Sequence, residues 1–243
     1  KYTGIDEYIV EADATAYCYP IVMSLLSKKS VSIMNFNNNS FQSDKNLILK
    51  LLDILNVKYK VDIGKLTIES NQIIKYNGSI DFDSSDTFMT FVVLFSCIDC
   101  NITITNIKNQ NLKECERINA IVNELGKLGV EITKNNDDLT IKGTTKNVYL
   151  NGKLNCYLDH RMAMSLSLMA NKIDDLILDD IECVNKTYPN YWNDMELFGM
   201  KLSNVNRDSY FETIKRTPII FIGLPSSGKT TIGTYLADNM NYD

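Results

Sequence analysis

Residues 86–94 read DTFMTFVVL, an aspartate followed by a run of mostly apolar side chains. Aspartate is a preferred N-cap residue, because its carboxylate accepts hydrogen bonds from the unpaired backbone N–H groups of a helix's first turn. The segment therefore predicts a helix that opens at Asp86, with the aspartate as its N-cap.

The same pattern occurs once before this segment and once after it. Residues 13–23 read DATAYCYPIVM, and residues 159–166 read DHRMAMSL. Asp13 and Asp86 are 73 positions apart, and so are Asp86 and Asp159. One capped helix is common in any protein, whereas three at one interval indicate an internal repeat, which sets the architecture.

Each repeat continues in a similar way after its first helix. Short segments rich in β-branched residues predict strands, at residues 31–33, 101–105 and 176–178. Second helices are expected near residues 44–55 and 114–128. The latter carries one apolar stripe and ends at Gly129, a residue suited to a helix C-terminus; the stripe consists of Ile118, Ile121, Val122, Leu125 and Leu128.

Paired strands close the first two repeats, at residues 57–61 with 66–69 and at residues 130–134 with 139–142. The third repeat is shorter and has a helix near residues 190–198. We predict an α/β domain of three βαβαββ-type repeats, packed around shared helices, over residues 1–203.

A second domain is predicted at the end of the chain, after a polar linker over residues 204–216. Residues 218–222, PIIFI, are typical of a buried parallel strand. They lead into GLPSSGKT at residues 223–230, which matches the GxxxxGK[ST] pattern of a P-loop. Residues 217–243 would then hold the first strand, the P-loop and the helix of a nucleotide-binding domain.

Composition excludes several classes of function. Hydrophobic residues make up 44% of the chain and charged residues 23%, as in an ordinary globular protein. The net charge of −5 and the pI near 5.0 argue against binding to nucleic acid or to a membrane surface. No apolar run reaches the length of about 18 residues that a membrane span needs. We expect a cytoplasmic protein without a signal peptide.

The six cysteines are scattered, as in a protein with reduced thiols. A lone CxxC at residues 97–100 and the single histidine, His160, do not predict a zinc site. Because residue 1 is not Met and a helix-like pattern stops at Asp243, we expect both ends to be cut.

Basic residues lie where helices are expected to begin. Lys113 and Arg117 are four positions apart and would share a face of the helix near 114–128. Arg161 would lie in the first turn of the helix that opens at Asp159, and Lys186 at the start of the last helix. Cations suit helix C-termini, so their placement at N-termini favours an anion bound between them. The alternative is that they are solvated surface charges.

Five segments resemble motifs of the EPSP synthase family. Residues 106–118, NIKNQNLKECERI, resemble its NxxNQRVKECNRI segment in the fungal form. Residues 157–165, YLDHRMAMS, are similar to YxDHRxAMS, and residues 182–189, ECVNKTYP, to xCVxKT[FWY]P. Residues 10–20 and 86–90 are similar to two further family segments, and all five occur in family order. The resemblance implies an inside-out α/β barrel lobe of three βαβαββ repeats, with the family's other lobe absent.

The resemblance also implies a reaction, in which the 5-hydroxyl of shikimate 3-phosphate attacks phosphoenolpyruvate and phosphate is then lost. No cofactor is implied for this step. Phosphoenolpyruvate would be bound by Arg117 and Arg161, and shikimate 3-phosphate by Asn109 and Lys113. Lys186 would contact a phosphate or carry a proton.

Three further residues complete the implied site. Asp86 would be the base for the 5-hydroxyl, Glu114 would move a proton at C3, and Cys183 lies at a motif position that is marked as active in some members. Each has a structural alternative: Asp86 as an N-cap, Glu114 as the partner of a neighbouring cation, and Cys183 as a packing residue. His160 is expected to be a packing residue and Asp13 a cap.

A P-loop follows these motifs directly. This order resembles that of the pentafunctional arom polypeptides of fungi, in which shikimate kinase follows the synthase. The resemblance implies ATP and Mg²⁺ as kinase cofactors, shikimate as the kinase substrate, and a homodimeric parent protein. Thr230 would ligate the metal, and ATP would be bound by Gly223, Leu224, Pro225, Ser226, Ser227, Gly228, Lys229 and Thr230.

The sequence departs from the family pattern at Ala12, Asn111 and Leu158. Three other interpretations stay open. The chain could be a UDP-N-acetylglucosamine enolpyruvyl transferase, a P-loop NTPase with an anion-binding α/β regulatory domain, or an inactive fragment. We expect residues 1–243 to be inactive without the rest of the synthase.

Overall fold

A computed structural model describes residues 9–146, 149–150 and 152–201. The chain divides into two compact units, Lys1–Met200 and Lys201–Asp243. The second unit lies outside the described residues apart from Lys201, so the predicted linker, strand and P-loop stay predictions.

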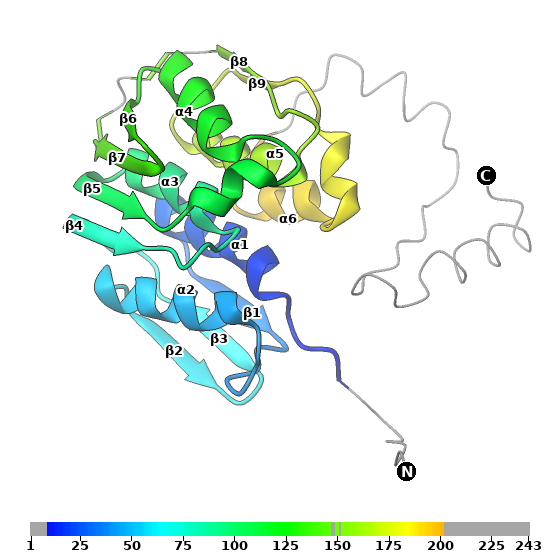
Figure 1. Cartoon of the computed structure of the whole chain (residues 1–243). Helices are drawn as coiled ribbons and strands as arrows, with labels where there is room; N and C mark the ends of the chain where they lie inside the picture. Colours follow the sequence, from blue (N-terminus) through cyan, green and yellow to red (C-terminus); the bar gives the residue numbers. More distant parts are fainter. Residues whose placement is uncertain (1–8, 147–148, 151, 202–243) are drawn as a thin grey trace, which may run out of the picture. The chain divides into compact units, whose positions relative to one another are not determined.

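The first two repeats contribute separate sheets (Figure 1). In the first repeat, β1 (Val31–Met34), β2 (Tyr59–Asp62) and β3 (Lys65–Ile68) form an antiparallel sheet in the order β1-β3-β2, with helices α1 (Ala14–Ser27) and α2 (Ser43–Ile54). In the second repeat, the sheet order is β4-β5-β7-β6. Its strands are β4 (Lys75–Asp81), β5 (Asp99–Thr105), β6 (Glu131–Asn135) and β7 (Asp138–Gly143).

The second repeat shows the complete βαβαββ order. Helix α3 (Phe88–Ser96) connects the parallel strands β4 and β5, and the 3₁₀ helix η1 (Lys108–Leu112) and helix α4 (Arg117–Lys127) connect β5 to the hairpin of β6 and β7. The first repeat matches this order from its first helix onward, since β1-β3-β2 corresponds to β5-β7-β6.

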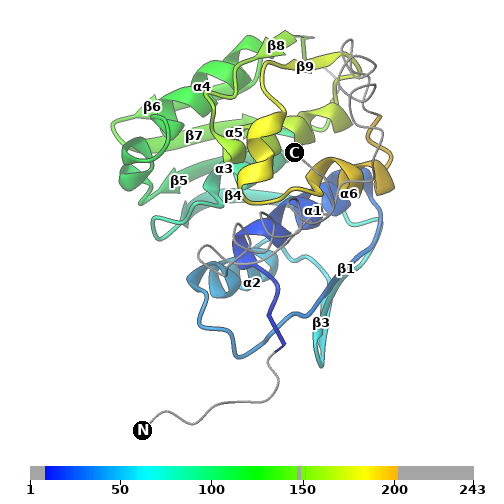
Figure 2. The ribbon, with the colours of Figure 1, turned by 90° about the vertical axis from the view of Figure 1, so that its right-hand side faces the viewer.

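The third repeat is shorter. Strands β8 (Gly152–Leu154) and β9 (Leu176–Leu178) are parallel and are connected by α5 (His160–Ser167) and the 3₁₀ helix η2 (Leu168–Asn171). The 3₁₀ helix η3 (Glu182–Lys186) and α6 (Tyr191–Leu197) follow, and α6 lies beside α1 (Figure 2). The helices and strands predicted before residue 201 are thus present, with shifted bounds, and β4 and β8 are two strands that the sequence did not predict. Their closure into a three-repeat barrel stays a prediction.

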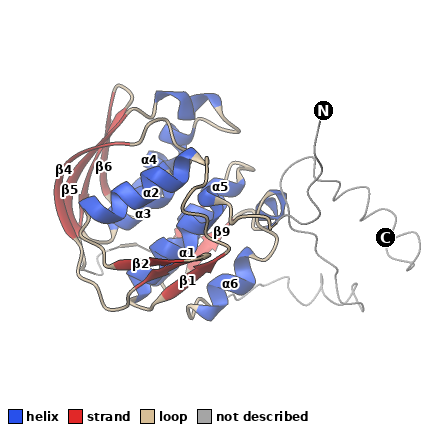
Figure 3. Ribbon diagram, turned by 90° about the horizontal axis from the view of Figure 1, so that it is seen from below, coloured by secondary structure: helices blue, strands red, loops and turns tan. Residues whose placement is uncertain are grey.

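Helices α3 and α4 pack against the sheet of β4 to β7, which lies along one side of this unit, and α6 lies at its edge (Figure 3). All nine residues of α3 are buried, and α3 packs between α1 and α5. A helix that is apolar on every side is stable only when other elements surround it completely. The first helices of the three repeats therefore form the shared core.

Two of the three predicted N-caps are confirmed. The Asp13 carboxylate accepts a hydrogen bond from the Ala16 backbone at 3.1 Å, and that of Asp159 accepts one from Arg161 at 2.9 Å. The prediction that Asp86 caps α3 is wrong, because this helix begins at Phe88 after the N-cap residue Thr87.

Two further helix starts differ from the predictions. Helix α4 begins at Arg117, so Lys113 and Glu114 precede it, because η1 and an extended residue 113 occupy this part of the chain. The Asn111 side chain accepts a hydrogen bond from the Ile118 backbone at 3.1 Å, which gives this departure from the family pattern a structural role. Lys186 ends η3 and does not begin α6.

The described helices include none that is long and apolar enough to cross a membrane. All six cysteines are free thiols. Among residues 9–146, 149–150 and 152–201, no group of three or more His, Cys, Asp or Glu side chains is placed to hold a metal ion.

Candidate active site

The side chain of Arg117 is at the centre of the charged cluster, although it is only 1% exposed. Its Nε donates to Asp159 Oδ2 at 2.8 Å, and its Nη2 donates to Glu114 Oε2 at 2.7 Å. Its Nη1 donates to Asp86 Oδ1 at 3.0 Å and to Gln110 Oε1 at 3.2 Å. One buried guanidinium therefore holds three carboxylates in a fixed arrangement.

Two cations in addition to Arg117 form ion pairs with Asp86. Lys113 Nζ lies 3.2 Å from Asp86 Oδ1, and Arg161 Nη2 lies 3.5 Å from Asp86 Oδ2. Burial opposes ionisation of the Asp86 carboxyl, but Arg161 and Arg117 outweigh it, and the pKa of Asp86 lies below its usual range. Asp86 is thus a carboxylate at neutral pH.

Glu114 connects the buried cluster to the surface. Its Oε1 accepts a hydrogen bond at 2.9 Å from Lys186, a side chain that is 60% exposed. Partial burial would raise the pKa of Glu114, but the hydrogen bond from Lys186 and the charge of Arg117 lower it to about 2. Glu114 therefore carries no proton at neutral pH in this arrangement.

Arg161 differs from Arg117 in having unused donors. Among the described residues its guanidinium has one ion pair, the contact with Asp86 at 3.5 Å, and it lies close to the Tyr19 hydroxyl. An arginine has five N–H donors in a planar fork that fits a carboxylate or a phosphate. Its side chain is 18% exposed, so an anion can reach it.

Two polar side chains next to the cluster have unsatisfied buried atoms in the part of the chain that the structure describes. Asn109 Nδ2 donates to the Ser84 carbonyl at 3.2 Å, while its Oδ1 has no partner. Both ring nitrogens of His160 are also without partners. Burial and the nearby Arg161 lower the pKa of His160 to about 4, so the ring is neutral.

Cys183 lacks the properties of a nucleophile. Burial and the charge of Asp180 raise the pKa of its thiol to about 12, and its Sγ donates to the Asp180 carbonyl. The thiolate is the reactive form of cysteine, so this thiol is unreactive at neutral pH.

The structure joins six of the predicted residues directly, through hydrogen bonds and ion pairs: Asp86, Lys113, Glu114, Arg117, Arg161 and Lys186. Sequence reasoning gave no role to Gln110, which is fully buried and bonds to both Asp86 and Arg117. It also treated Asp159 only as a cap. Gln110 and Asp159 each lie inside one of the family motifs, and this position could have identified them as site residues from the sequence.

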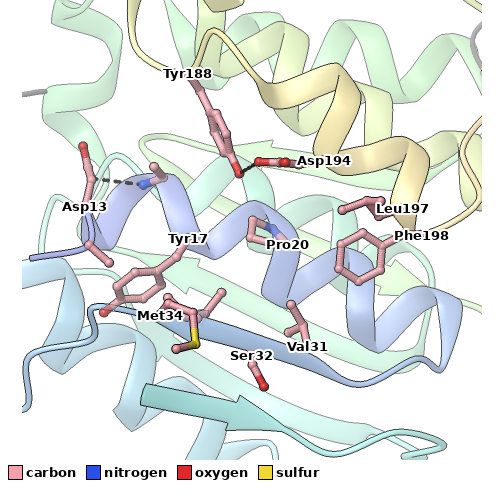
Figure 4. A pocket seen from close by; sticks show the side chains of 13 residues that line it. Asp13, Tyr17, Pro20, Val31, Ser32, Met34, Tyr188, Asp194, Leu197 and Phe198 are labelled. Carbon is pink, nitrogen blue, oxygen red and sulfur yellow. Dashed lines mark hydrogen bonds between the residues drawn. The ribbon is translucent and has the colours of Figure 1, made fainter. Parts of the chain in front are cut away.

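The cluster lines neither of two cavities in the described part of the chain. One cavity, of 360 Å³, lies between α1, β1 and the segment that carries Tyr188 and Asp194, whose side chains are hydrogen-bonded at 2.6 Å (Figure 4). The other, of 760 Å³, is lined by residues from Ile9 to Gly64. The cluster lies outside both cavities, and Lys113 and Lys186 reach solvent from it.

The predicted ATP-binding residues 223–230 and the metal ligand Thr230 fall outside the described residues.

Comparison with known proteins identifies the family. The family model described as EPSP synthase (3-phosphoshikimate 1-carboxyvinyltransferase) matches residues 3–195. The chain is 34% identical to the pentafunctional AROM polypeptide of Pneumocystis carinii and 31% identical to AROM polypeptide 2 of Lodderomyces elongisporus. These alignments cover 98% and 99% of this chain but only 16% of each relative.

Solved structures agree at the level of the fold. An EPSP synthase from Acinetobacter baumannii aligns with a TM-score of 0.67 at 17% identity, over 79% of this chain and 47% of that chain. The chain thus spans about half the length of this synthase and about a sixth of the length of the curated relatives. The match to the family model covers most of the chain, and the fold agrees with it: the chain belongs to the EPSP synthase family.

Proposed function

We propose that this chain supplies the phosphoenolpyruvate-binding part of an EPSP synthase within a multifunctional polypeptide. Together with the rest of the protein it transfers the enolpyruvyl group of phosphoenolpyruvate to the 5-hydroxyl of 3-phosphoshikimate, and phosphate leaves. The observation that carries this proposal is the cluster of cations around Asp86, in a chain of net charge −5 that matches the family over residues 3–195.

Arg161 binds the first anion in this proposal, because its fork has unused donors and is partly exposed. Lys113 and Lys186 each hold a single carboxylate and reach solvent, so they can turn toward anionic groups of the two substrates. Asn109 Oδ1, buried without a partner, is suited to accept a hydrogen bond from a substrate hydroxyl.

Arg117 can bind phosphoenolpyruvate only by giving up one of its present partners. Asp86 is the partner of Arg117 that also contacts Arg161. If both guanidiniums turn to the substrate carboxylate, Asp86 loses the charges that lower its pKa. Binding of the anion would then convert Asp86 from an ion-pair partner into a stronger base for the 5-hydroxyl.

Glu114 and Lys186 form the proposed route for the proton at C3. Lys186 donates a hydrogen bond to Glu114, and Glu114 is ionised in this arrangement. We assign Cys183 no chemical step, because its thiol stays protonated.

The test uses a full-length polypeptide that contains this chain, with phosphoenolpyruvate and 3-phosphoshikimate, and measures the release of phosphate and the formation of EPSP. We expect turnover by the wild-type protein and a loss of at least about 100-fold in Asp86→Ala, typical of a missing general base. Unchanged turnover in Asp86→Ala would contradict the role of Asp86 as the base. A wild-type protein that forms no EPSP would favour a P-loop NTPase with an anion-binding regulatory domain. Turnover with UDP-N-acetylglucosamine in place of 3-phosphoshikimate would identify the other enolpyruvyl transferase.

We further propose that residues 217–243 begin a shikimate kinase. The GxxxxGK[ST] motif supports this, as do alignments to AROM polypeptides that cover 98–99% of the chain. ATP-dependent phosphorylation of shikimate by the full-length protein, abolished by Lys229→Ala, is the expected result. Phosphorylation that survives this substitution would contradict the proposal.

A further inference from the structure

The three aspartates that lie 73 residues apart, Asp13, Asp86 and Asp159, have different roles. Asp13 and Asp159 cap the helices that follow them. Asp86 occupies the same place in the second repeat, yet its carboxylate bonds to Gln110 at 3.1 Å and to Arg117 at 3.0 Å. Some other group must therefore satisfy the first turn of α3, because buried backbone N–H groups are costly to leave unpaired.

The Ser85 carbonyl accepts a hydrogen bond from the Phe88 backbone N–H at 3.5 Å, and the Ser85 side chain fixes the turn before the helix. Its Oγ accepts a hydrogen bond from the Thr87 backbone N–H at 3.1 Å and lies 2.8 Å from Thr87 Oγ1. Both residues are buried. These contacts fix the turn just before the helix, which starts two residues after Asp86 and whose N-cap Thr87 makes no side-chain cap hydrogen bond.

Asp44 fixes the direction of the Ser85 hydroxyl. Its Oδ1 accepts the Ser85 Oγ hydrogen at 2.8 Å, and its Oδ2 accepts that of Thr15 Oγ1 at 2.5 Å. A hydroxyl has one hydrogen and two lone pairs. Because the Ser85 hydrogen goes to Asp44, both lone pairs face Thr87, which donates through its backbone and its hydroxyl.

The other side of the same loop is held from η1. The Ser84 carbonyl accepts hydrogen bonds from Gln110 Nε2 at 2.8 Å and from Asn109 Nδ2 at 3.2 Å. Asp83 and Ser84 have φ angles of 46° and 59°, in the left-handed region that residues other than glycine rarely adopt. The surrounding contacts hold the backbone in this conformation. The loop is therefore fixed from α2 on one side and from η1 on the other.

We propose that Ser85, oriented by Asp44, is a positioning residue that fixes the turn around Asp86 and so keeps the Asp86 carboxylate in the cation cluster. The inference rests on the proposed role of Asp86 as the base. Without the Ser85 hydroxyl, the Thr87 backbone N–H loses its acceptor. Asp86 would then turn to the helix as Asp13 and Asp159 do, away from Arg161.

The kinetic test compares Ser85→Ala and Ser85→Thr in the full-length polypeptide. We expect Ser85→Ala to lower kcat for EPSP formation about tenfold or more, with KM for phosphoenolpyruvate within about threefold, since the lost interaction acts on the reacting base. Ser85→Thr keeps the hydroxyl and should retain most of the wild-type kcat. Equal kcat values for wild type and Ser85→Ala would overturn the proposal.

A second pair of variants tests whether a lower kcat results only from a damaged fold. Asp44→Ala should lower kcat in the same way. Asp53→Ala should not, because this carboxylate of the same helix has the Tyr59 hydroxyl as its one hydrogen-bond partner among the described residues. A fall of the same size in both variants would show a general effect on α2 and contradict the proposal.

A crystal structure of the Ser85→Ala protein tests the inference without activity. The Asp86 carboxylate should lie within hydrogen-bond distance of a backbone N–H in the first turn of α3. A carboxylate that still faces Gln110 and Arg117 would overturn the inference. A wild-type protein that makes no EPSP would instead defeat the proposed function, and this structural result would still decide the positioning role.

Discussion

Arg117 and Arg161 both contact Asp86, and they differ in what surrounds the rest of each guanidinium. Arg117 is 1% exposed and holds the fully buried Asp159, whereas Arg161 is 18% exposed and its single ion pair among the described residues is 3.5 Å long. A buried charge that loses its partner is far more costly than a partly exposed one. The two arginines should therefore contribute differently to stability and to binding.

We expect Arg117→Met to lower the free energy of unfolding by about 3–5 kcal/mol, because the buried Asp159 carboxylate loses its guanidinium partner. Arg161→Met should cost about 1 kcal/mol or less in stability while it raises KM for phosphoenolpyruvate. Urea unfolding and steady-state kinetics on the full-length protein measure the two effects. Similar unfolding free energies for both variants would contradict the distinction.

The ionisation of Glu114 should depend on Lys186. The folded-state pKa of about 2 is below that of an unfolded glutamate, so the ion pair stabilises the fold above about pH 4.3 and this contribution is lost as pH falls toward 2. In Lys186→Met the Glu114 pKa should rise, as followed by NMR titration of its side-chain carboxyl carbon. Lys113→Met is the matched control, since Lys113 pairs with Asp86. An unchanged Glu114 pKa in Lys186→Met would disprove the assignment.

At the scale of elements, the position of β7 depends on a close approach to the end of α3. A Cβ atom on Gly143 would lie 1.8 Å from the Phe95 carbonyl oxygen and 2.4 Å from that of Ile98. Both neighbours are backbone atoms and cannot turn away. Only glycine lets this strand end pack against the connection between α3 and β5.

Gly143→Ala should therefore destabilise the fold by at least about 1–3 kcal/mol, the usual cost of overpacking. Gly126→Ala is the matched control, because nothing lies within 4 Å of its added Cβ and it is inside α4. It should stabilise the protein by about 0.5–1 kcal/mol, the difference in helix propensity. Thermal unfolding of both variants measures the effect, and a stable Gly143→Ala protein would exclude the close approach.

At the scale of the whole molecule, the cluster contacts neither of the two cavities and is reached by solvent through Lys113 and Lys186. The chain also corresponds to 47% of a solved EPSP synthase. Bringing two polyanions together requires cations and orientation from more than one side. Under the proposed function, the cations around Asp86 supply one side of such a site.

Purified residues 1–243 should accordingly show no enolpyruvyl transfer, although the full-length polypeptide is active in the same assay. Circular dichroism of the fragment serves as the control for folding. Detectable formation of EPSP by the folded fragment would contradict this expectation and place a complete site within the chain.

Sequence alone predicted the 73-residue spacing of the aspartates, most helices and strands of the described residues and the charged residues of the cluster, because these follow from local spacing and from motifs within a few residues. It missed strands β4 (Lys75–Asp81) and β8 (Gly152–Leu154). It predicted Asp13 and Asp159 correctly as caps and Asp86 wrongly. The tertiary structure decided which donors each carboxylate meets: Asp86 bonds to side chains 24 and 31 positions away, and Arg117 reaches Asp159 across 42. Competition between a local backbone N–H and a distant guanidinium for one carboxylate depends on packing, which no local pattern encodes.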